Sequence, residues 1–346
     1  MSARIEALSR RLDLPLLVTN LTNVYYLTGF DSSNAALLVD PKGGATLYTD
    51  FRYAESAREV PGVEVEMTKR AMMRDVGARL SGKVQFEADV LPYLEWQRLA
   101  EGTAELVPTS GIVDGVRAVK DAEEVAKLRK AARIADRALE ALTAETWVGR
   151  TEKQIAWRLQ ELCHAHGADE QSFPSIVASG PNGALPHGHP TDRIVDRGTL
   201  VTIDWGVRVD GYYSDCTRTF STGGLPARLR EIYDVCLDAQ KHAVANIKAG
   251  MTGVEADALA RDRISAAGYG EAFGHGLGHG VGMAVHEAPR LSTESTDTLE
   301  VGHCVTIEPG IYLPGKGGVR IEDLAIVRED GVDVLTGFPK DLVEVG

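Results

Sequence analysis

One short pattern that occurs twice constrains this chain more than any other feature of its sequence. Residues 201–206 read V-T-I-D-W-G, and residues 305–310 read V-T-I-E-P-G. Each copy is an apolar run typical of a buried β-strand. Each run also ends on a carboxylate, Asp204 in the first copy and Glu308 in the second. Two matching strands that each deliver an acid at the end indicate an internally duplicated fold.

A second carboxylate follows each copy of the pattern on the far side of a turn. Asp204 and Asp215 lie on either side of a turn that we expect to be centred near Val209-Asp210, and Glu308 and Glu322 lie on either side of one centred on Gly315. In an antiparallel hairpin, side chains nearly opposite each other on one face lie about 4.5–5.5 Å apart, so we expect each hairpin to present a pair of acids. If the hairpins face each other, the carboxylates repel strongly unless cations neutralise them. The repeat therefore predicts a metal centre.

The helices around these strands are repeated as well. Periodic apolar residues predict two helices ahead of each hairpin, at 122–144, 151–166, 227–248 and 252–267. The second helix of each half begins with a capping box, at Thr151 in one half and at Thr252 in the other. Matching caps, order and spacing predict a pseudo-two-fold domain. We expect its helices on one side of a curved sheet and the site in the concavity between the halves.

The first third of the chain has a different pattern. Short apolar runs alternate there with helical patterns, which is typical of a small α/β domain. The runs that predict strands are 14–18, 35–39, 45–48 and 83–87, and the predicted helices include 52–60 and 70–80. We therefore expect an α+β protein with two domains, 1–117 and 118–346, divided just before the first long helix.

The composition excludes several classes of protein. The chain has 346 residues, 44% of them apolar, and a net charge of −13, so we expect no electrostatic footprint for nucleic acid, and no run of Lys or Arg indicates an anionic membrane surface. No apolar run is long enough to predict a membrane-spanning helix, and the N-terminus lacks the apolar segment of a signal peptide. The four cysteines are far apart in sequence, which is typical of free thiols in a reducing compartment. We expect a cytoplasmic protein.

A glycine-rich segment lies between the two pairs of acids. Glycine occupies every second position from 274 to 282, and His275 and His279 stand between these glycines. Alternate glycines leave one face of an extended segment bare, so that its backbone can approach a crowded centre. The histidines then project from the other face, and we expect one of these imidazoles to join the metal centre.

Three further motifs resemble those of a known family. They are L-P-H-G at 185–188, H-E-A-P-R at 286–290 and V-R-I-E-D at 319–323. Together with the acids and His279, they resemble the Xaa-Pro peptidases, which comprise the prolidases and aminopeptidase P. The resemblance covers about residues 116–340 and implies the pita-bread fold shared with creatinase and methionine aminopeptidase. It extends more weakly over 1–115, which is similar to the creatinase-type N-terminal domain of that family.

The resemblance implies a dinuclear metal centre. Five residues would hold two divalent metal ions: Asp204, Asp215, His279, Glu308 and Glu322. Four oxygen donors and one imidazole are a fairly hard ligand set, so Mn²⁺ is the first expectation, with Co²⁺, Zn²⁺ and Fe²⁺ as alternatives. By the same resemblance, a hydroxide that bridges the metals attacks the carbonyl before proline, and Glu308 acts as the general base.

Other motif positions would, by the same resemblance, bind substrate or support the ligands. His187 would steady the substrate carbonyl or its oxyanion, and His286 would touch substrate and help to protonate the leaving nitrogen. Residues expected to support the ligands through hydrogen bonds are His275, Tyr312 and Arg320. His189 matches no family position, and we interpret it as an exposed loop histidine.

The residues leave two classes of substrate open. A dipeptide ends in a carboxylate just beyond proline, and a bidentate arginine is the natural partner of that carboxylate. Arg290 matches such an arginine, while Arg52 either reaches over the site or is an ordinary surface arginine. We expect a homodimeric prolidase that cleaves Xaa-Pro dipeptides. The alternative is an aminopeptidase P that acts on longer peptides.

Other proteins with this fold are less consistent with the sequence. Methionine aminopeptidases lack an N-terminal domain of this kind, and creatinases do not need the metal ligands. Non-catalytic binding modules of the same fold lose these ligands, whereas all five are present in this chain. A binding module is therefore the more distant alternative to a peptidase.

Overall fold

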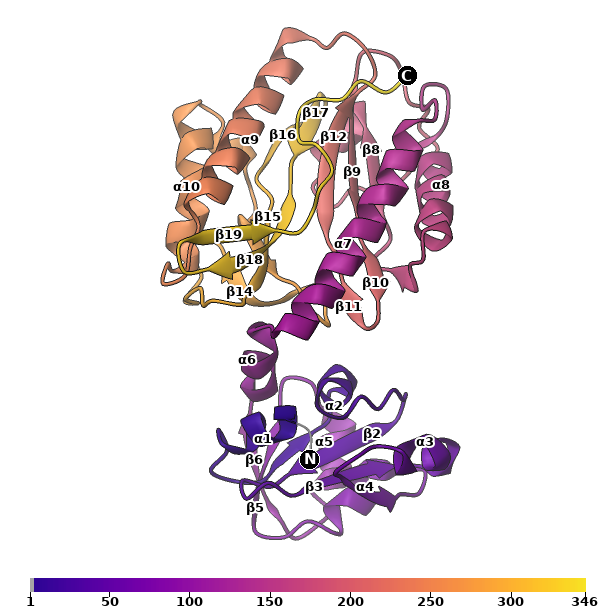
Figure 1. Ribbon diagram of the computed structural model, residues 1–346, viewed down its shortest axis with the longest axis vertical. Helices are drawn as coiled ribbons and strands as arrows, with labels where there is room; N and C mark the ends of the chain where they lie inside the picture. The colour runs from indigo at the N-terminus through magenta and orange to yellow at the C-terminus, as the bar shows by residue number, and fades with distance from the viewer. Residues whose placement is uncertain (1–2) are drawn as a thin grey trace. The chain divides into compact units, whose positions relative to one another are not determined.

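The computed structural model describes residues 3–346. The chain divides into two compact units, Met1–Arg117 and Ala118–Gly346, and each is described by itself (Figure 1). Within 3–346, none of the helices combines the length and apolar content that crossing a membrane requires. All four cysteines are buried free thiols, as the sequence predicted.

A six-stranded mixed sheet forms the core of the first unit. In the order of their pairing, its strands are β4 (Glu64–Met67), β3 (Ala45–Thr49), β2 (Ala35–Val39), β1 (Leu16–Val18), β5 (Lys83–Glu87) and β6 (Glu105–Thr109). The helices of this part are α1 (Ala3–Ser9), α2 (Leu21–Thr28), α3 (Ala54–Arg58), α4 (Met72–Gly77), α5 (Tyr93–Leu99) and α6 (Ile112–Ala118). The predicted α/β pattern is confirmed, although α3 and α4 are shorter than the helices expected at 52–60 and 70–80.

The second unit begins with two long helices and two small antiparallel sheets. The helices are α7 (Ala122–Thr143) and α8 (Glu152–Ala165). One sheet contains β8 (Ile176–Ser179), β9 (Leu200–Trp205) and β12 (Cys216–Ser221), and the other contains β7 (Glu170–Gln171), β10 (Val207–Val209) and β11 (Tyr212–Tyr213). Trp205 of β9 is buried and donates its indole N–H to the Ala135 carbonyl of α7 at 3.0 Å. This contact ties the helix to the strand that carries Asp204.

The remaining part of the unit repeats this order. Its helices are α9 (Ala227–Asn246) and α10 (Gly253–Ala266). A five-stranded sheet follows, in the order β14 (Glu287–Leu291), β13 (Gly278–Gly280), β15 (Cys304–Ile307), β18 (Asp323–Arg328) and β19 (Gly331–Val334). A separate two-stranded ribbon consists of β16 (Gly310–Leu313) and β17 (Gly317–Arg320). Figure 1 shows α7 and α8 beside the strands of the first half, and α9 and α10 beside those of the second.

The internal duplication predicted from the sequence is confirmed. The four helices of the second unit lie within two residues of their expected bounds. Thr151 and Thr252 both form complete capping boxes, in which each threonine hydroxyl accepts from the third residue of its helix. A buried apolar cluster fills each half, one centred on Trp147 and Trp205 and the other on Tyr233 and Phe273.

Two details differ from the sequence-based expectation. The strands do not form one continuous sheet; the halves are joined where the Glu322 N–H donates to the Thr217 carbonyl at 3.1 Å. The first pair of acids is also not directly opposed, because Asp204 faces Thr217 and Asp215 lies two residues before that partner. The cause is the two-residue turn at Asp210 and Gly211, whose positive φ angles of 52° and 83° set this register.

The second pair of acids follows the expected geometry more closely. Ile307 pairs with Asp323, and Gly310 pairs with Arg320 in the same register. Glu308 and Glu322 therefore stand opposite each other between the two ladders. The turn that closes this ribbon uses Gly315, whose φ of 72° favours glycine.

Candidate metal centre

Three carboxylates from different strands converge in the second unit. Asp204 is the fifth residue of β9, Asp215 immediately precedes β12, and Glu322 stands between β17 and β18. One ligand oxygen from each residue lies within 4.8 Å of the others. Asp215 and Glu322 are buried and Asp204 is half-buried. This arrangement can enclose a cation.

His279 and Glu308 extend the cluster on one side. The Nε2 atom of His279, in β13, lies 3.3 Å from Glu308 Oε1 and 3.7 Å from Asp215 Oδ2. The other ring nitrogen, Nδ1, is 3.0 Å from the Gly280 carbonyl, which accepts a hydrogen bond only if Nδ1 carries the proton. In the neutral ring, the Nε2 lone pair therefore points toward the carboxylates, as a metal ligand requires.

The alternate glycines allow this crowding. A Cβ atom on Gly278 would lie 2.1 Å from the Thr306 carbonyl oxygen, and one on Gly280 would lie 2.1 Å from the Ala288 carbonyl oxygen. Either side chain would push β13 away from its neighbours, and His279 with it. The bare face expected for this segment is thus present at the positions that flank His279.

The pKa values of the acids in the cluster are strongly shifted. Burial raises the pKa of Asp215 well above its usual value, and the charges of Glu322 and Asp204 raise it further. Burial likewise raises the pKa of Glu322 well above its ordinary range, with added repulsion from Glu308 and Asp204. Repulsion among buried acids of this kind is relieved either by protons or by bound cations.

Glu308 behaves differently from the other acids. Burial favours its neutral form, but without metal the hydrogen bond and charge of a protonated His279, with the charges of His275 and Arg320, lower the pKa of Glu308 to about 2. Thr306 Oγ1 donates to Glu308 Oε1 at 3.0 Å and accepts from the His279 backbone N–H at 3.0 Å. Glu308 is therefore ionised at neutral pH, and its Oε1 atom is held in place.

Arg320 links the cluster to a supporting network. Its Nη2 donates to Asp204 Oδ2 at 2.7 Å, and its Nε donates to Thr217 Oγ1 at 3.0 Å. Its Nη1 donates to the Tyr312 hydroxyl at 2.8 Å, and that hydroxyl lies 2.9 Å from His275 Nε2. His275, Tyr312 and Arg320 thus form one chain of contacts beside the carboxylates.

Two carboxylate oxygens of the cluster are left without a hydrogen-bond donor among the described residues, as a cation site requires. Asp204 Oδ1 and Glu322 Oε1 are buried, and neither has a hydrogen-bond partner among residues 3–346. The other oxygen of the Asp204 carboxylate accepts a hydrogen bond from Arg320, and the other oxygen of the Glu322 carboxylate accepts one from Thr217. A buried oxygen without a partner is costly unless a cation or proton satisfies it. These two oxygens, with the imidazole Nε2, fit divalent metal ions.

A cavity of about 750 Å³ opens onto the cluster. Besides the acids, its lining includes His187, His189, His286 and Arg290. The His286 ring lies 4.3 Å from that of His279 between centroids, and burial followed by the charge of His279 lowers the pKa of His286. Phe173, Pro174, Ile176 and Val285 add apolar surface. The cavity thus combines the carboxylates with imidazoles, a guanidinium and an apolar wall.

Arg52 belongs to the first unit. Its Nε and Nη2 donate to Asp50 Oδ1 and Oδ2 at 2.9 and 2.7 Å, so one edge of the guanidinium already holds a carboxylate. Arg290 is exposed and lines the cavity, and its side chain forms no ion pair among the described residues. Of the two arginines considered for the substrate carboxylate, Arg290 has the guanidinium that is not engaged by a neighbouring acid.

Two hydroxyl groups were missed by sequence reasoning. Thr217 donates to Glu322 Oε2 at 2.7 Å, and Thr306 orients both His279 and Glu308. Thr306 is the threonine of the second V-T-I copy, so the repeat contained a signal for it. Thr217 lies outside any recognisable motif, and only the strand register brings it opposite Asp204.

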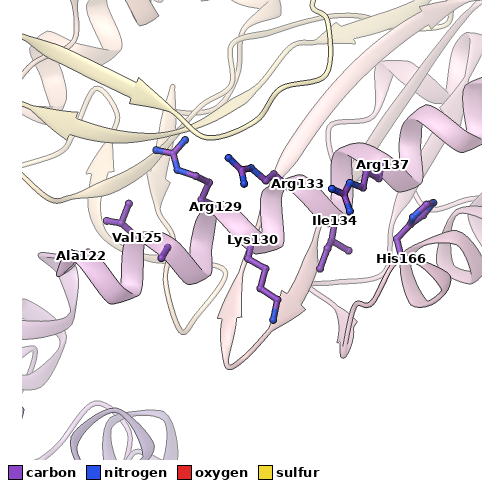
Figure 2. Close-up of a pocket in the computed structure, with 9 residues that line it drawn as sticks. Ala122, Val125, Arg129, Lys130, Arg133, Ile134, Arg137 and His166 are labelled. Carbon is purple, nitrogen blue, oxygen red and sulfur yellow. The ribbon is translucent and has the colours of Figure 1, made fainter.

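A second hollow, on the outer face of α7, differs sharply from this cavity. Its volume is about 630 Å³, and Figure 2 shows the cationic side chains of Arg129, Lys130, Arg133 and Arg137 along the helix. None of the residues that line it carries a carboxylate. Among the two hollows, only the cavity at the acidic cluster can bind metal cations.

Comparisons with known proteins agree with this picture. The model of metallopeptidase family M24 matches residues 126–329, and that of the creatinase/prolidase N-terminal domain matches residues 6–119. The sequence is 36% identical to the Xaa-Pro dipeptidase of Pyrococcus horikoshii, over 95% of this chain and 94% of that protein.

Solved structures are similar over nearly the whole chain. The Xaa-Pro dipeptidase from Bacillus anthracis superposes with a TM-score of 0.95 at 40% identity, covering 99% of both chains. The X-Pro aminopeptidase from Thermotoga maritima MSB8 superposes with a TM-score of 0.88 at 34% identity, covering 97% of this chain and 99% of that one. The chain therefore belongs to metallopeptidase family M24, with the creatinase/prolidase N-terminal domain and the pita-bread fold of the prolidase-type enzymes.

Proposed function

We propose that this protein is a metal-dependent Xaa-Pro dipeptidase. The observation that carries the proposal is the acidic cluster, in which two buried carboxylate oxygens have no hydrogen-bond partner among the described residues. The residues that carry these oxygens line a cavity together with histidines and Arg290. The dipeptidase names of the relatives from P. horikoshii and B. anthracis support the same activity. The proposed substrates are therefore free Xaa-Pro dipeptides.

Five residues would hold two divalent metal ions per chain: Asp204, Asp215, His279, Glu308 and Glu322. The hardness of this donor set favours Mn²⁺, with Co²⁺, Zn²⁺ and Fe²⁺ as alternatives. When bound, such ions lower the pKa of a water molecule and stabilise the negative charge that develops on the substrate oxygen. Glu308, ionised at neutral pH, presents Oε2 as the proton acceptor for the attacking water, while Oε1 stays bonded to Thr306.

Two of the histidines that line the cavity, His286 and His187, would act directly on the substrate. The leaving group is the proline nitrogen, a secondary amine that must gain a proton as the bond breaks. His286 borders His279, and its lowered pKa keeps it neutral and able to pass a proton near pH 7. His187 lines the same cavity from another loop, where its ring can donate to the substrate carbonyl oxygen.

The ligand assignment is tested by conservative amide variants. Glu322→Gln and Asp215→Asn keep side-chain size but remove the charge that attracts cations. We expect both variants to lose bound metal and turnover together, because each removes an anionic donor from the shared centre. Retention of two metal ions per chain with wild-type kcat would contradict the assignment.

The choice of dipeptides over longer peptides rests on Arg290. Its unpaired guanidinium lines the cavity and can bind the carboxylate that ends a dipeptide. The likeness to the T. maritima aminopeptidase makes removal of the first residue from longer Xaa-Pro peptides the second candidate. Assays of Leu-Pro and Met-Pro against an Xaa-Pro-Pro tripeptide discriminate the two, and higher kcat/KM for the tripeptide would favour the aminopeptidase.

Two further expectations complete the proposal. We propose that the protein is a cytoplasmic homodimer. The dimer rests on family resemblance, and the compartment rests on the four buried free thiols, which are typical of a reducing environment. Sedimentation of the purified protein tests the dimer, and a monomer at working concentration would remove it.

A further inference from the structure

Glu152, the first residue of α8, is a fully buried carboxylate outside the metal cluster. Its Oε1 accepts from the Ser179 backbone N–H at 2.6 Å and from the Ser179 hydroxyl at 2.8 Å. Its Oε2 accepts from Asn182 Nδ2 at 2.8 Å, and from the backbone N–H and hydroxyl of Thr191 at 2.9 and 2.6 Å. Every donor is neutral, so the carboxylate is held by hydrogen bonds rather than by a cation.

These donors lie on both sides of the loop that carries His187. Ser179 ends β8 and Asn182 follows it, whereas Thr191 begins the return of the chain after the loop. Asn182 also donates from Nδ2 to the His189 carbonyl at 3.3 Å. Local turns shape the loop itself, because the Leu185 N–H donates to the Asn182 carbonyl at 3.0 Å. Glu152 therefore fastens both ends of the loop to the start of one helix.

The second half of the fold contains the same junction. The Glu152 N–H donates to the Arg193 carbonyl at 3.0 Å, and the Gly253 N–H donates to the Asp297 carbonyl at 2.8 Å. Thr151 forms an isolated antiparallel bridge with Ile194, just as Thr252 does with Thr298. His286 lies in the connection between β13 and β14, earlier in the segment that reaches Thr298. The segments that carry the two histidines therefore occupy pseudo-equivalent places beside equivalent helices.

The two halves fasten these loops by different means. At Gly253, which corresponds to Glu152, a Cβ atom would lie 2.1 Å from the Arg290 carbonyl oxygen and 2.4 Å from Ser295 Oγ. Strand β14, which follows His286, and the segment after it thus pack directly onto a bare helix start. In the first half the side chain of Glu152 occupies this place and connects the helix start to the His187 loop through hydrogen bonds.

We infer that Glu152 is the positioning residue for His187. The inference rests on the proposed function, because it assigns to Glu152 the placement of a histidine that acts on substrate. An ionised carboxylate suits this place because it only accepts hydrogen bonds, and all the surrounding groups donate. An amide there would turn its NH₂ toward some of these donors and leave them unsatisfied, which loosens both ends of the loop.

The variant Glu152→Gln tests the inference, with Gln154→Ala as the matched control. Gln154 is exposed and completes the capping box of the same helix, but it contacts none of the loop donors. We expect Glu152→Gln to lower kcat by up to about 10²-fold, with little change in KM or in bound metal. Hydrogen exchange should accelerate within 179–191. Gln154→Ala should destabilise the helix start while kcat and exchange in 179–191 stay at wild-type values.

A double variant distinguishes positioning from general damage. If Glu152 acts through His187, Glu152→Gln should lower kcat in the wild type but not in the His187→Ala background. Equal losses in the two backgrounds would overturn the inference, because Glu152 would then act independently of His187.

Hydrogen exchange separates failure of the inference from failure of the proposed function. Wild-type activity in His187→Ala would remove the catalytic role of His187. The anchor would still be supported if Glu152→Gln accelerated exchange in 179–191, with exchange elsewhere at wild-type rates. Unchanged exchange in that segment would overturn the anchor whatever the activity.

Discussion

Arg320 and Asp204 form a buried ion pair that leaves one carboxylate oxygen free. Nη2 of Arg320 lies 2.7 Å from Oδ2 of Asp204, whereas Oδ1 is buried and without a hydrogen-bond partner among the described residues. The arginine therefore orients the carboxylate without satisfying it. Asp204 remains an acceptor with a fixed direction toward Asp215 and Glu322. A site built in this way is arranged for cations before they arrive.

Replacing Arg320 should be costly to the metal-free protein. Arg320→Met removes a buried cation from among several acids, and breaking a buried ion pair typically costs about 3–5 kcal/mol. Chemical unfolding in a chelator measures the change in free energy of unfolding. Arg208→Met is the control, because Arg208 pairs with the exposed Glu170, and a pair of that kind contributes about 1 kcal/mol or less. A loss no larger than that of the control would contradict the role given to Arg320.

The metal-free protein should lose stability as the pH rises above about 4, the unfolded-state pKa of the carboxyl groups of Asp215 and Glu322. The folded-state pKa values of Asp215 and Glu322 lie well above their unfolded values of about 4. Between those values the folded state holds protons that the unfolded state releases, so stability falls with rising pH. The slope is at most about 1.4 kcal/mol per pH unit for each group.

Urea unfolding at several pH values, with a chelator and with added Mn²⁺, checks this slope. Asp215→Asn should flatten it, because the amide does not titrate, and saturating metal should also flatten it because cations replace the protons. An identical slope in the wild type and in Asp215→Asn, both without metal, would show that Asp215 does not titrate as described.

His187→Ala should separate metal binding from turnover. His187 lines the cavity but is not one of the five proposed ligands, so metal content should stay near that of the wild type. Loss of a group that stabilises an oxyanion lowers kcat by roughly 10²–10³-fold. Metal analysis and steady-state kinetics on one dipeptide measure both quantities. Loss of metal from a correctly folded variant would instead make His187 a ligand.

Arg290 should determine the response to the substrate carboxylate. Arg290→Ala is expected to raise KM for Leu-Pro, because the charge-assisted hydrogen bonds to the carboxylate are lost. Converting that carboxylate to an amide should raise the KM of the wild type in the same way and have little further effect on the variant. Arg52→Ala provides the comparison for the other arginine. If only Arg52→Ala raised KM, Arg52 rather than Arg290 would bind the carboxylate.

The sequence predicted those features that depend on local periodicity and repetition. The V-T-I copies located β9, which carries Asp204, and β15, which ends just before Glu308, and the capping boxes located α8 and α10. The diagonal placement of Asp215 was not predicted, because it depends on the register that a two-residue turn imposes. Local patterns contain propensity and periodicity, whereas register is fixed by pairing across the sheet.

The supporting contacts were harder to predict than the acids they support. Thr217 reaches Glu322 across more than a hundred residues of sequence, and Glu152 reaches Thr191 from another element. Such contacts arise only when separate elements pack, and neither residue belongs to a repeated or periodic pattern that points to its partner. The sequence therefore indicated the chemistry of the centre, and the three-dimensional packing revealed what holds it in place.

Hydrolysis of Leu-Pro before and after removal of metal tests the central claim most directly. Exhaustive chelation should abolish release of free proline while the protein remains folded. Adding Mn²⁺ back should restore activity as about two ions bind per chain. Release of proline at an undiminished rate from protein shown to contain no metal would contradict the account, as would a metal-loaded protein that leaves Leu-Pro and Met-Pro intact.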